Sequence, residues 1–217
     1  MRYIYLLIIL LLFSCNNERV LHLPEIENAE ITEVLDVSPA YIFYDETQPD
    51  STLLNRKNII TSTNWLVNVD KRLTLRQAIP HIKLLQEKKR NAGLHKNENA
   101  KNYFTCNDTS IKNLGFLEFT EVNFITEESP ILDKENYCFV TINSLSEVLI
   151  STSIDFNFAF SKENFKIALA EIKKEQESVK IVLVFNDSIS FQDYIKVKSV
   201  LTSFEESISN NEFIFHL

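Results

Sequence analysis

Glycine is almost missing from this chain, and its scarcity restricts both the turns and the ligand sites that the fold can contain. Only Gly93 and Gly115 occur among the 217 residues. Phosphate-binding loops, the dinucleotide-binding GxGxxG turn and the GxSxG nucleophile elbow each need several glycines, because the backbone there approaches a ligand or adopts a positive φ. These three kinds of site are therefore excluded.

The composition is that of a folded protein with an acidic surface. Apolar residues make up 45% of the chain and charged residues 24%, which is typical of a globular domain. The length suffices for one ordinary domain or two small ones. The formal net charge is −8, whereas nucleic-acid binding generally needs a basic surface that displaces counterions from phosphates. We therefore expect no nucleic-acid partner.

The N-terminus has the layout of a bacterial lipoprotein signal peptide, over residues 1–14. Arg2 supplies a positive charge, and residues 3–13 form an uninterrupted apolar run. This run is too short to span a bilayer, which takes about 20 apolar residues, and it has the length of a signal-peptide core. It ends in LFSC (residues 12–15), which resembles the lipoprotein cleavage motif with Cys15 as the lipid-accepting residue. An ordinary signal peptide that is cleaved elsewhere is the alternative.

Cleavage before Cys15 predicts a mature chain that is anchored in a membrane by its acyl chains, since two or more such chains give stable attachment. Asn16 stands where an aspartate would retain an enterobacterial lipoprotein at the inner membrane, which favours the outer membrane of the cell envelope. Residues 15–38 carry six acids and one arginine without sustained periodicity, and we interpret them as a lipid-anchored, solvated tether. A short helix within residues 26–37 is the alternative.

The remainder of the chain repeats a pattern, which predicts an internal duplication. Four segments recur in the same order, with apolar and polar residues in matching places: residues 41–44 with 137–140, 67–69 with 156–158, 75–82 with 165–172, and 106–109 with 185–188. Each copy is expected to contain two strands, a helix, a strand and a second helix. The predicted fold class is α+β, with two tandem α/β sandwich modules at residues 39–130 and 131–217. Each module would be a mixed sheet with two helices on one face.

A strand, an aspartate and an amphipathic helix follow one another in the second copy. An apolar strand over residues 181–186 precedes Asp187, and Phe191 begins a helical segment that includes the pair Lys196-Val197. This order resembles the periplasmic domain of the biopolymer-transport proteins ExbD and TolR. The resemblance implies small α/β modules that contact proteins and, in some members, peptidoglycan. The proton-coupled transmembrane aspartate of that family has no counterpart here, because residues 1–15 hold no acid.

Two groups of residues are candidates for contact with a partner. The resemblance points to the beginning of the last helix, with Asp187, Phe191 and Tyr194. The second group is the basic run Lys88-Lys89-Arg90, within residues 70–101, which hold nine bases and three acids. In an acidic protein, such a basic island could meet an anionic polymer or an acidic partner, and a solvated helix face is the alternative.

Other reactive side chains have an ordinary structural interpretation. Asp45, Glu46 and Asp50 group carboxylates of the kind that divalent cations favour, but a solvated turn explains them without a cation. Cys106 and Cys138 lie in apolar, strand-like runs and are expected to be two buried thiols, although an envelope compartment would permit a disulfide. The four histidines are scattered without ligand spacing, so no metal or cofactor is expected.

Together these features predict a non-enzymatic, lipid-anchored envelope protein that binds a protein or cell-wall partner, as an accessory to ExbD- or TolR-type machinery. The alternative is a structural, dimerising component of a cell-surface complex with no transport role. Either hypothesis leaves open a homodimer and an internal pair of modules. An enzyme is not expected, because no Ser/His/Asp or Cys/His set can be proposed.

Overall fold

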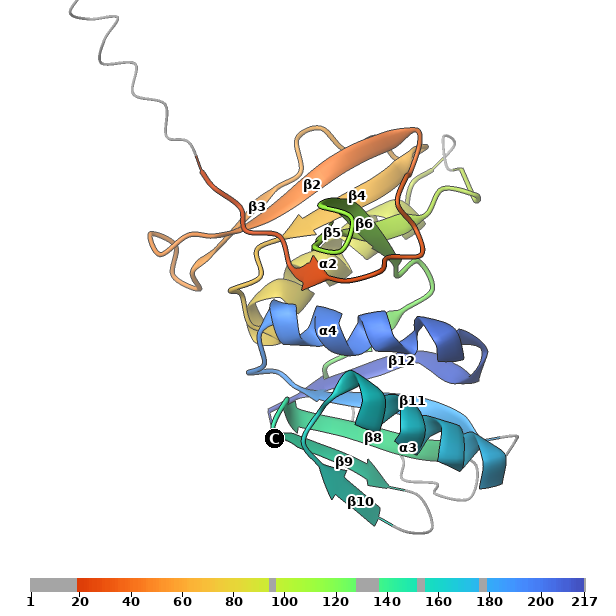
Figure 1. The fold of residues 1–217 in the computed structure, drawn as a ribbon. Coiled ribbons are helices and arrows are strands. Elements are labelled where there is room, and N and C mark those ends of the chain that lie inside the picture. Colours follow the sequence, from red (N-terminus) through yellow and green to blue (C-terminus); the bar gives the residue numbers. More distant parts are fainter. Residues whose placement is uncertain (1–18, 94–96, 128–136, 152–154, 176–178, 217) are drawn as a thin grey trace, which may run out of the picture.

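Two mixed β-sheets with helices between them make up the fold (Figure 1). The computed structural model describes residues 19–93, 97–127, 137–151, 155–175 and 179–216. The elements before residue 119 are β1 (Glu25–Ile26), β2 (Val37–Tyr44), β3 (Thr52–Asn55), β4 (Asn64–Val69), α2 (Leu75–Arg90), β5 (Asn102–Asp108) and β6 (Asn113–Glu118). The later elements are β7 (Asn123–Ile125), β8 (Tyr137–Ser144), β9 (Glu147–Ser151), β10 (Asp155–Phe158), α3 (Lys162–Glu175), β11 (Lys180–Asn186), α4 (Phe191–Leu201), the 3₁₀ helix η1 (Thr202–Ser207) and β12 (Ile208–Phe215).

The two sheets are built in the same order, which confirms two α/β modules of the α+β class. In the first, the hairpin β2–β3 is followed by β4 parallel to β2, the crossover helix α2, and β5 parallel to β4. In the second, the hairpin β8–β9 is followed by β11 parallel to β8, the crossover helix α4, and β12 parallel to β11. The second module also contains β10 and α3, inserted between β9 and β11. The prediction of two helices holds for this module, whereas the described part of the first module has only α2.

The two sheets share a topology, but three of the four sequence matches pair segments that are not equivalent, including residues 106–109 at the end of β5 with residues 185–188 at the end of β11. Residues 41–44 and 137–140 do belong to the equivalent strands β2 and β8. The equivalent of β4 is β11 rather than residues 156–158, and the equivalent of α2 is α4 rather than residues 165–172. The helix that follows each strand supports this pairing, because Asp70 and Asn186 each stand four residues before the N-cap residue of a crossover helix, Thr74 and Ser190. Because β10 and α3 are inserted before β11, the equivalents of β4 and α2 lie later in the chain than the sequence matches placed them.

The chain that leads into the first module packs against its sheet. Within the segment that we interpreted as a tether, the carbonyls of His22, Pro24 and Ile31 accept backbone hydrogen bonds from the first module at 2.7–2.9 Å. Ile26 is buried, and β1 pairs in parallel with the end of β5. Residues 22–31 are therefore part of the module, because their backbone carbonyls pair with its strands and Ile26 enters its core. No helix forms over residues 26–37.

One hydrophobic core runs through both modules. The ring of Phe104 in β5 lies 3.8 Å from that of Phe119 and 5.2 Å from that of Phe191 in α4, measured between centroids. Helix α4 thus packs between the two sheets, with α2 beside it, and α3 lies next to α4 on the second sheet (Figure 1). Strand β7 lies within the predicted first module by residue number, yet it pairs with β12 in the second sheet. The modules are therefore interlocked.

Candidate functional site

The beginnings of α2 and α4 meet in a short antiparallel contact, which we call the seam. Thr74 and Ser190, the N-cap residues of the two helices, face each other as a β-bridge. Four backbone hydrogen bonds complete the seam: Leu75 N–H to the Ile189 carbonyl (3.0 Å), Arg76 N–H to Asp187 (2.8 Å), Phe191 N–H to Leu73 (2.6 Å) and Gln192 N–H to Lys71 (3.2 Å). The first N–H groups of a helix have no partner within the helix. Here each module supplies the acceptors for the other, so the two modules pair within one chain.

Asp187 closes the exposed side of the seam. Its carboxylate receives two hydrogen bonds from the guanidinium of Arg76, at 2.8 and 2.9 Å, and lies 3.2 Å from Nδ1 of His216. Hydrogen bonding from Arg76 lowers the pKa of Asp187, and His216 adds to this effect. Such bidentate pairs fix orientation as well as charge. Asp187 is therefore engaged in holding the modules together.

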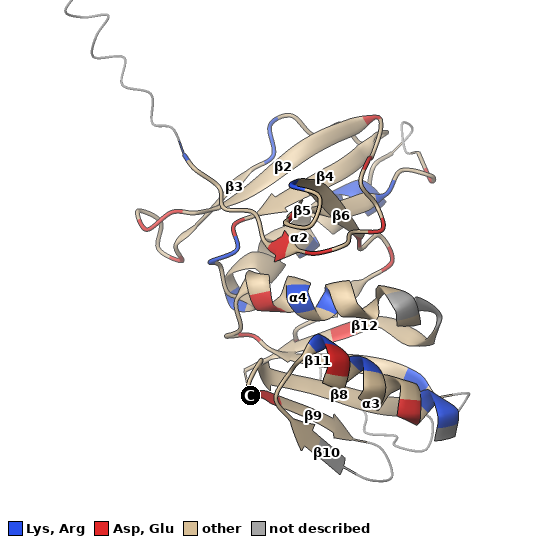
Figure 2. Cartoon of the chain, in the orientation of Figure 1, with Lys and Arg blue, Asp and Glu red and all other residues tan. Residues whose placement is uncertain are grey.

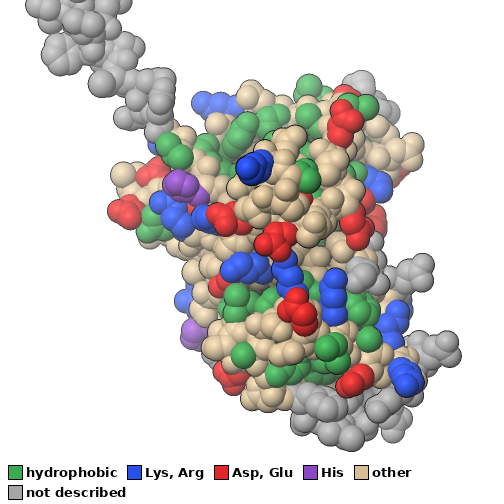
Figure 3. Space-filling model, in the orientation of Figure 1, with side chains coloured by type: hydrophobic (Ala, Val, Ile, Leu, Met, Phe, Trp, Pro, Cys, Tyr) green, Lys and Arg blue, Asp and Glu red, His purple; other side chains and the backbone are tan. Residues whose placement is uncertain are grey.

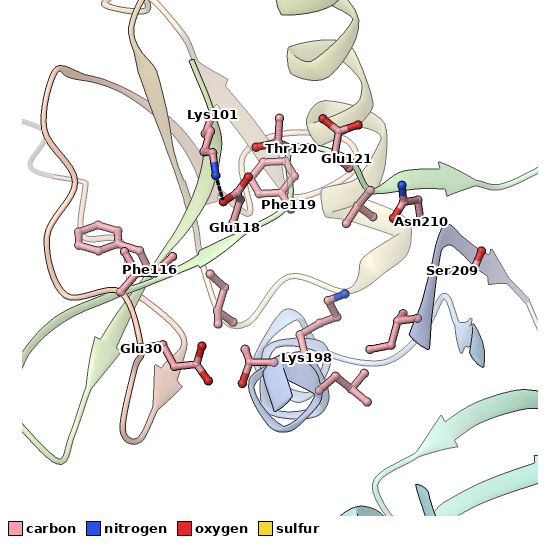
Figure 4. Close-up of a pocket in the computed structure, with 16 residues that line it drawn as sticks. Glu30, Lys101, Phe116, Glu118, Phe119, Thr120, Glu121, Lys198, Ser209 and Asn210 are labelled. Carbon is pink, nitrogen blue, oxygen red and sulfur yellow. Dashed lines mark hydrogen bonds and ion pairs between the residues drawn. The ribbon is translucent and has the colours of Figure 1, made fainter. Parts of the chain in front are cut away.

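A groove of about 440 Å³ lies between the modules, on the side of the seam towards the C-terminal end of α4 (Figure 4). One wall comes from β6 and residues 119–122, and the other comes from α4 and residues 208–210. Lys101 and Glu118 form an ion pair on the first wall at 2.8 Å. Figure 4 shows Lys198 extending from α4 into the space between the walls. The groove therefore offers charges of both signs to whatever enters it.

A buried carboxylate fixes the second wall of the groove. Glu212 is 1% exposed and accepts a hydrogen bond from the hydroxyl of Tyr194 at 2.8 Å. Its other oxygen pairs with the ammonium group of Lys198. Burial, and then the neighbouring Glu212, raise the pKa of Tyr194 well above its usual value, so the hydroxyl keeps its proton and remains a donor. This network holds α4 against β12 at the edge of the groove.

A smaller pocket of about 240 Å³ continues the groove, and the two cavities share Thr120, Glu121 and Asn210. Lys89 lines the smaller pocket although it is only 6% exposed. Its ammonium group donates to the carbonyl of Lys101 at 2.8 Å and to the side chain of Asn102 at 3.0 Å, both of which are neutral acceptors. Burial therefore lowers the pKa of Lys89 to about 8.

The sequence-predicted site residues are not brought together. Phe191 and Tyr194 are completely buried in the core, so neither side chain is available to a partner on the surface. Lys88 is exposed, and Arg90 donates to Asn123 at 3.2 Å at the rim of the smaller pocket. Figure 2 shows that basic and acidic residues alternate along α3 and α4. Cys15 and the predicted signal peptide, residues 1–14, lie outside the described residues.

The other candidates occupy ordinary structural positions. Asp45 and Asp50 each accept hydrogen bonds from the residue two positions later, Thr47 and Thr52, and so close local turns. Across the part of the chain that the structure describes, no group of three or more His, Cys, Asp or Glu side chains is placed to hold a metal ion. Cys106 and Cys138 are two free, buried thiols, as predicted, and burial raises the pKa of both. Neither is therefore an activated nucleophile.

Three important side chains were missed from sequence: Arg76, Lys198 and Glu212. Arg76 follows the N-cap of α2 and has no local partner, since its carboxylate is supplied by the other module. Lys198 lies four residues after Tyr194, on the same helix face. Glu212 alternates with the buried Ile214 in β12, and that alternation was the available signal for an inward-facing acid.

No protein-family model, no curated protein and no solved structure matches this chain. Among the helices within the described residues, none is long and apolar enough to cross a membrane. Function is therefore inferred from the seam, the groove beside it and the N-terminal signal.

Proposed function

We propose that this chain is a lipid-anchored protein of the bacterial cell envelope that binds an extended segment of a protein or cell-wall partner in the groove, without catalysing a reaction. The observation that carries this proposal is the groove itself, because both modules contribute to it and its volume of about 440 Å³ lies within the usual range of binding sites, roughly 300–1,000 Å³. The LFSC motif at residues 12–15 supports the anchor.

The chemistry of the lining favours an extended partner with both polar and apolar groups. The ion pair of Lys101 with Glu118 stands on one wall, and Lys198, paired with Glu212, stands on the other. Apolar side chains such as Phe116 and Ile208 line the cavity between these charges. The charges favour a partner with a complementary charge order, and the apolar side chains offer it buried area. A peptide or a wall glycopeptide meets this requirement.

A narrower form of the proposal is an accessory role in ExbD- or TolR-type transport machinery. It is supported by the order of strand, aspartate and helix at residues 181–197, on which the resemblance rests. Under this form the partner in the groove would be a protein of that machinery.

Site-specific photo-cross-linking in intact cells tests the proposal. A photoreactive residue replaces Thr120, which faces both cavities, or Ile167, which is exposed on α3 and serves as the matched control. Adducts with one protein or with wall fragments at position 120, and not at 167, are expected. A motor protein or a TonB-like protein in the adduct supports the narrower form. Equal adducts at both positions, or none at 120, would contradict binding in the groove.

The anchor is tested separately by labelling cells with an alkyne-bearing palmitate. The wild-type protein is expected to incorporate the label, and Cys15→Ala is expected to lose it. Incorporation that survives the substitution, or an unlabelled wild type, would refute lipidation at Cys15.

A further inference from the structure

The distance between the proposed lipid and the first module is very short. Arg19 lies four positions after Cys15, and an extended chain over this distance spans at most about 14 Å. Arg19 pairs with Asp45 at 3.4 Å, and three residues later the backbone of His22 is bonded to Asp70 and Lys71. The first module is therefore held beside the anchor, without the free tether that the composition of residues 15–38 indicated.

This short reach forces the first module onto the membrane surface. The interfacial layer of one leaflet is about 5–8 Å thick, so crossing it takes about half of the roughly 14 Å that the chain from Cys15 to Arg19 can span. A module of about 100 residues has a radius of gyration of about 13 Å, so it cannot stand clear of the lipid on such a connection. The remaining question is which of its surfaces faces the lipid.

The outer face of the first sheet carries no helix, and it holds half-buried apolar side chains among polar ones, since Asn55 and Asn68 flank Tyr41. Tyr41 and Phe43 in β2, Leu53 in β3 and Leu66 in β4 share this face by their register, which places them opposite the core-facing residues between them. The rings of Tyr41 and Phe43 stack with centroids 5.8 Å apart. In Figure 1, α2, α4 and α3 all lie on the other side of this sheet, and Figure 3 shows hydrophobic side chains gathered over β2 and β3.

The N-terminal segment that leads from Cys15 reaches the module beside the end of β2. Strand β2 ends one residue before Asp45, the ion-pair partner of Arg19. Tyrosine prefers a membrane interface, where its ring is in an apolar layer and its hydroxyl is wet. Arg56 and Lys57 are exposed in the turn after β3 and add positive charge beside the face. The acidic turn at residues 45–51 lies at the same end of β2, so anionic headgroups would repel this end while apolar contact holds the face itself.

We propose that the outer face of the first sheet, defined by Tyr41, Phe43, Leu53 and Leu66, lies on the lipid surface as a second membrane contact beside the acyl anchor. The inference rests on the proposed lipidation of Cys15. A second contact of this kind fixes the orientation of a protein that the acyl chains alone would leave free to rotate.

Fluorescence quenching in vesicles tests the proposal. Full-length, lipidated Leu53→Cys is purified, labelled with an environment-sensitive fluorophore and reconstituted in vesicles of phosphatidylethanolamine and phosphatidylglycerol that contain a brominated lipid. Cys106 and Cys138 are buried, so the label reacts at position 53. Ile167→Cys, exposed on α3, is the control, and Lys57→Cys reports the rim of the same face if Leu53→Cys misfolds.

Blue-shifted emission and quenching by the brominated lipid are expected at positions 53 and 57 and not at 167. Labels at 53 and 57 that stay unquenched on a protein shown by mass to carry its lipid would overturn the membrane contact while leaving the anchor intact. If mass spectrometry shows no lipid on the protein, the proposed lipidation of Cys15 is wrong, whatever the fluorescence shows.

Discussion

Lys89 provides a sharp test of how α2 packs against the first sheet, because it is a buried cation with neutral partners. Its ammonium group lies 5.2 Å from the centroid of the Trp65 ring and donates to Lys101 and Asn102. Lys89→Met keeps the unbranched stem and removes the charge. The variant leaves two acceptors without a donor, which costs about 1–3 kcal/mol and does not depend on pH.

The pH dependence of the free energy of unfolding separates the cost of burying the Lys89 charge from the loss of its hydrogen bonds. The pKa of Lys89 is about 8 in the folded protein, against 10.5 for the free side chain. Between these values the unfolded chain binds more protons than the folded one, so the free energy of unfolding of the wild type rises with pH. A shift of this size corresponds to about 3 kcal/mol in all, of which about 2.5 kcal/mol is regained between pH 7 and pH 10.

The assay is chemical unfolding followed by the fluorescence of Trp65, the only tryptophan. The difference in the free energy of unfolding between wild type and Lys89→Met is measured at several values between pH 7 and pH 10. It should change by about 2.5 kcal/mol in favour of the wild type as the pH rises. Lys88→Met, at an exposed neighbour on the same helix, should give a constant difference. A constant difference for Lys89→Met as well would refute the burial of its charge.

Three further substitutions test other parts of the fold. A Cβ at Gly115 would lie 2.5 Å from the Cβ of Ala29, so Gly115→Ala should lower the free energy of unfolding by about 1–3 kcal/mol, whereas Gly93→Ala, with open space around it, should not. Tyr194→Phe removes the donor to a buried carboxylate and should cost about 1–3 kcal/mol in denaturant unfolding. Burial opposes ionisation of Asp108, but hydrogen bonds from nearby hydroxyl and backbone groups outweigh it and lower its pKa to about 2. Its contribution to stability should therefore be lost as the pH falls from about 4 towards 2, and Asp108→Asn should flatten the acid-unfolding curve over that range.

Local patterns in the sequence predicted several elements, but they missed β1 and the number of helices in the described part of the first module. The N-cap at Thr74 with Gln77 three residues later predicts the beginning of α2, and the structure contains this capping box. The register of the duplication was wrong because residues 67–69 of β4 resemble the alternating residues 156–158 of β10, whereas the equivalent strand β11 is a continuous apolar run. The equivalence of β4 and β11 follows from the pairing of strands in each sheet.

The basic run shows why burial was harder to predict than secondary structure. Lys88, Lys89 and Arg90 are equivalent by composition, yet successive residues of a helix point about 100° apart. Ile82, Leu85 and Lys89 follow the spacing of the buried stripe, so only the middle cation of the run enters the core. Helical spacing could have identified Lys89, whereas the overall charge of the run favoured a uniformly solvated face.

The seam was not predictable from local pattern, because it joins residues more than a hundred positions apart. Thr74 and Ser190 each correctly predict the beginning of a helix. A cap side chain binds only some of the first N–H groups, however, and the others need a partner from elsewhere. In this chain the N–H groups at the start of each helix donate to carbonyls just before the other helix. This pairing places α4 of the second module under the first sheet. The groove is a consequence of that crossing. One wall of the groove is β6, a strand of the first sheet, so the groove lies at an edge of that sheet. With the outer face of that sheet on lipid, the proposed binding site would be held a fixed distance from the membrane, and a partner would have to approach it from the side rather than through the bilayer surface.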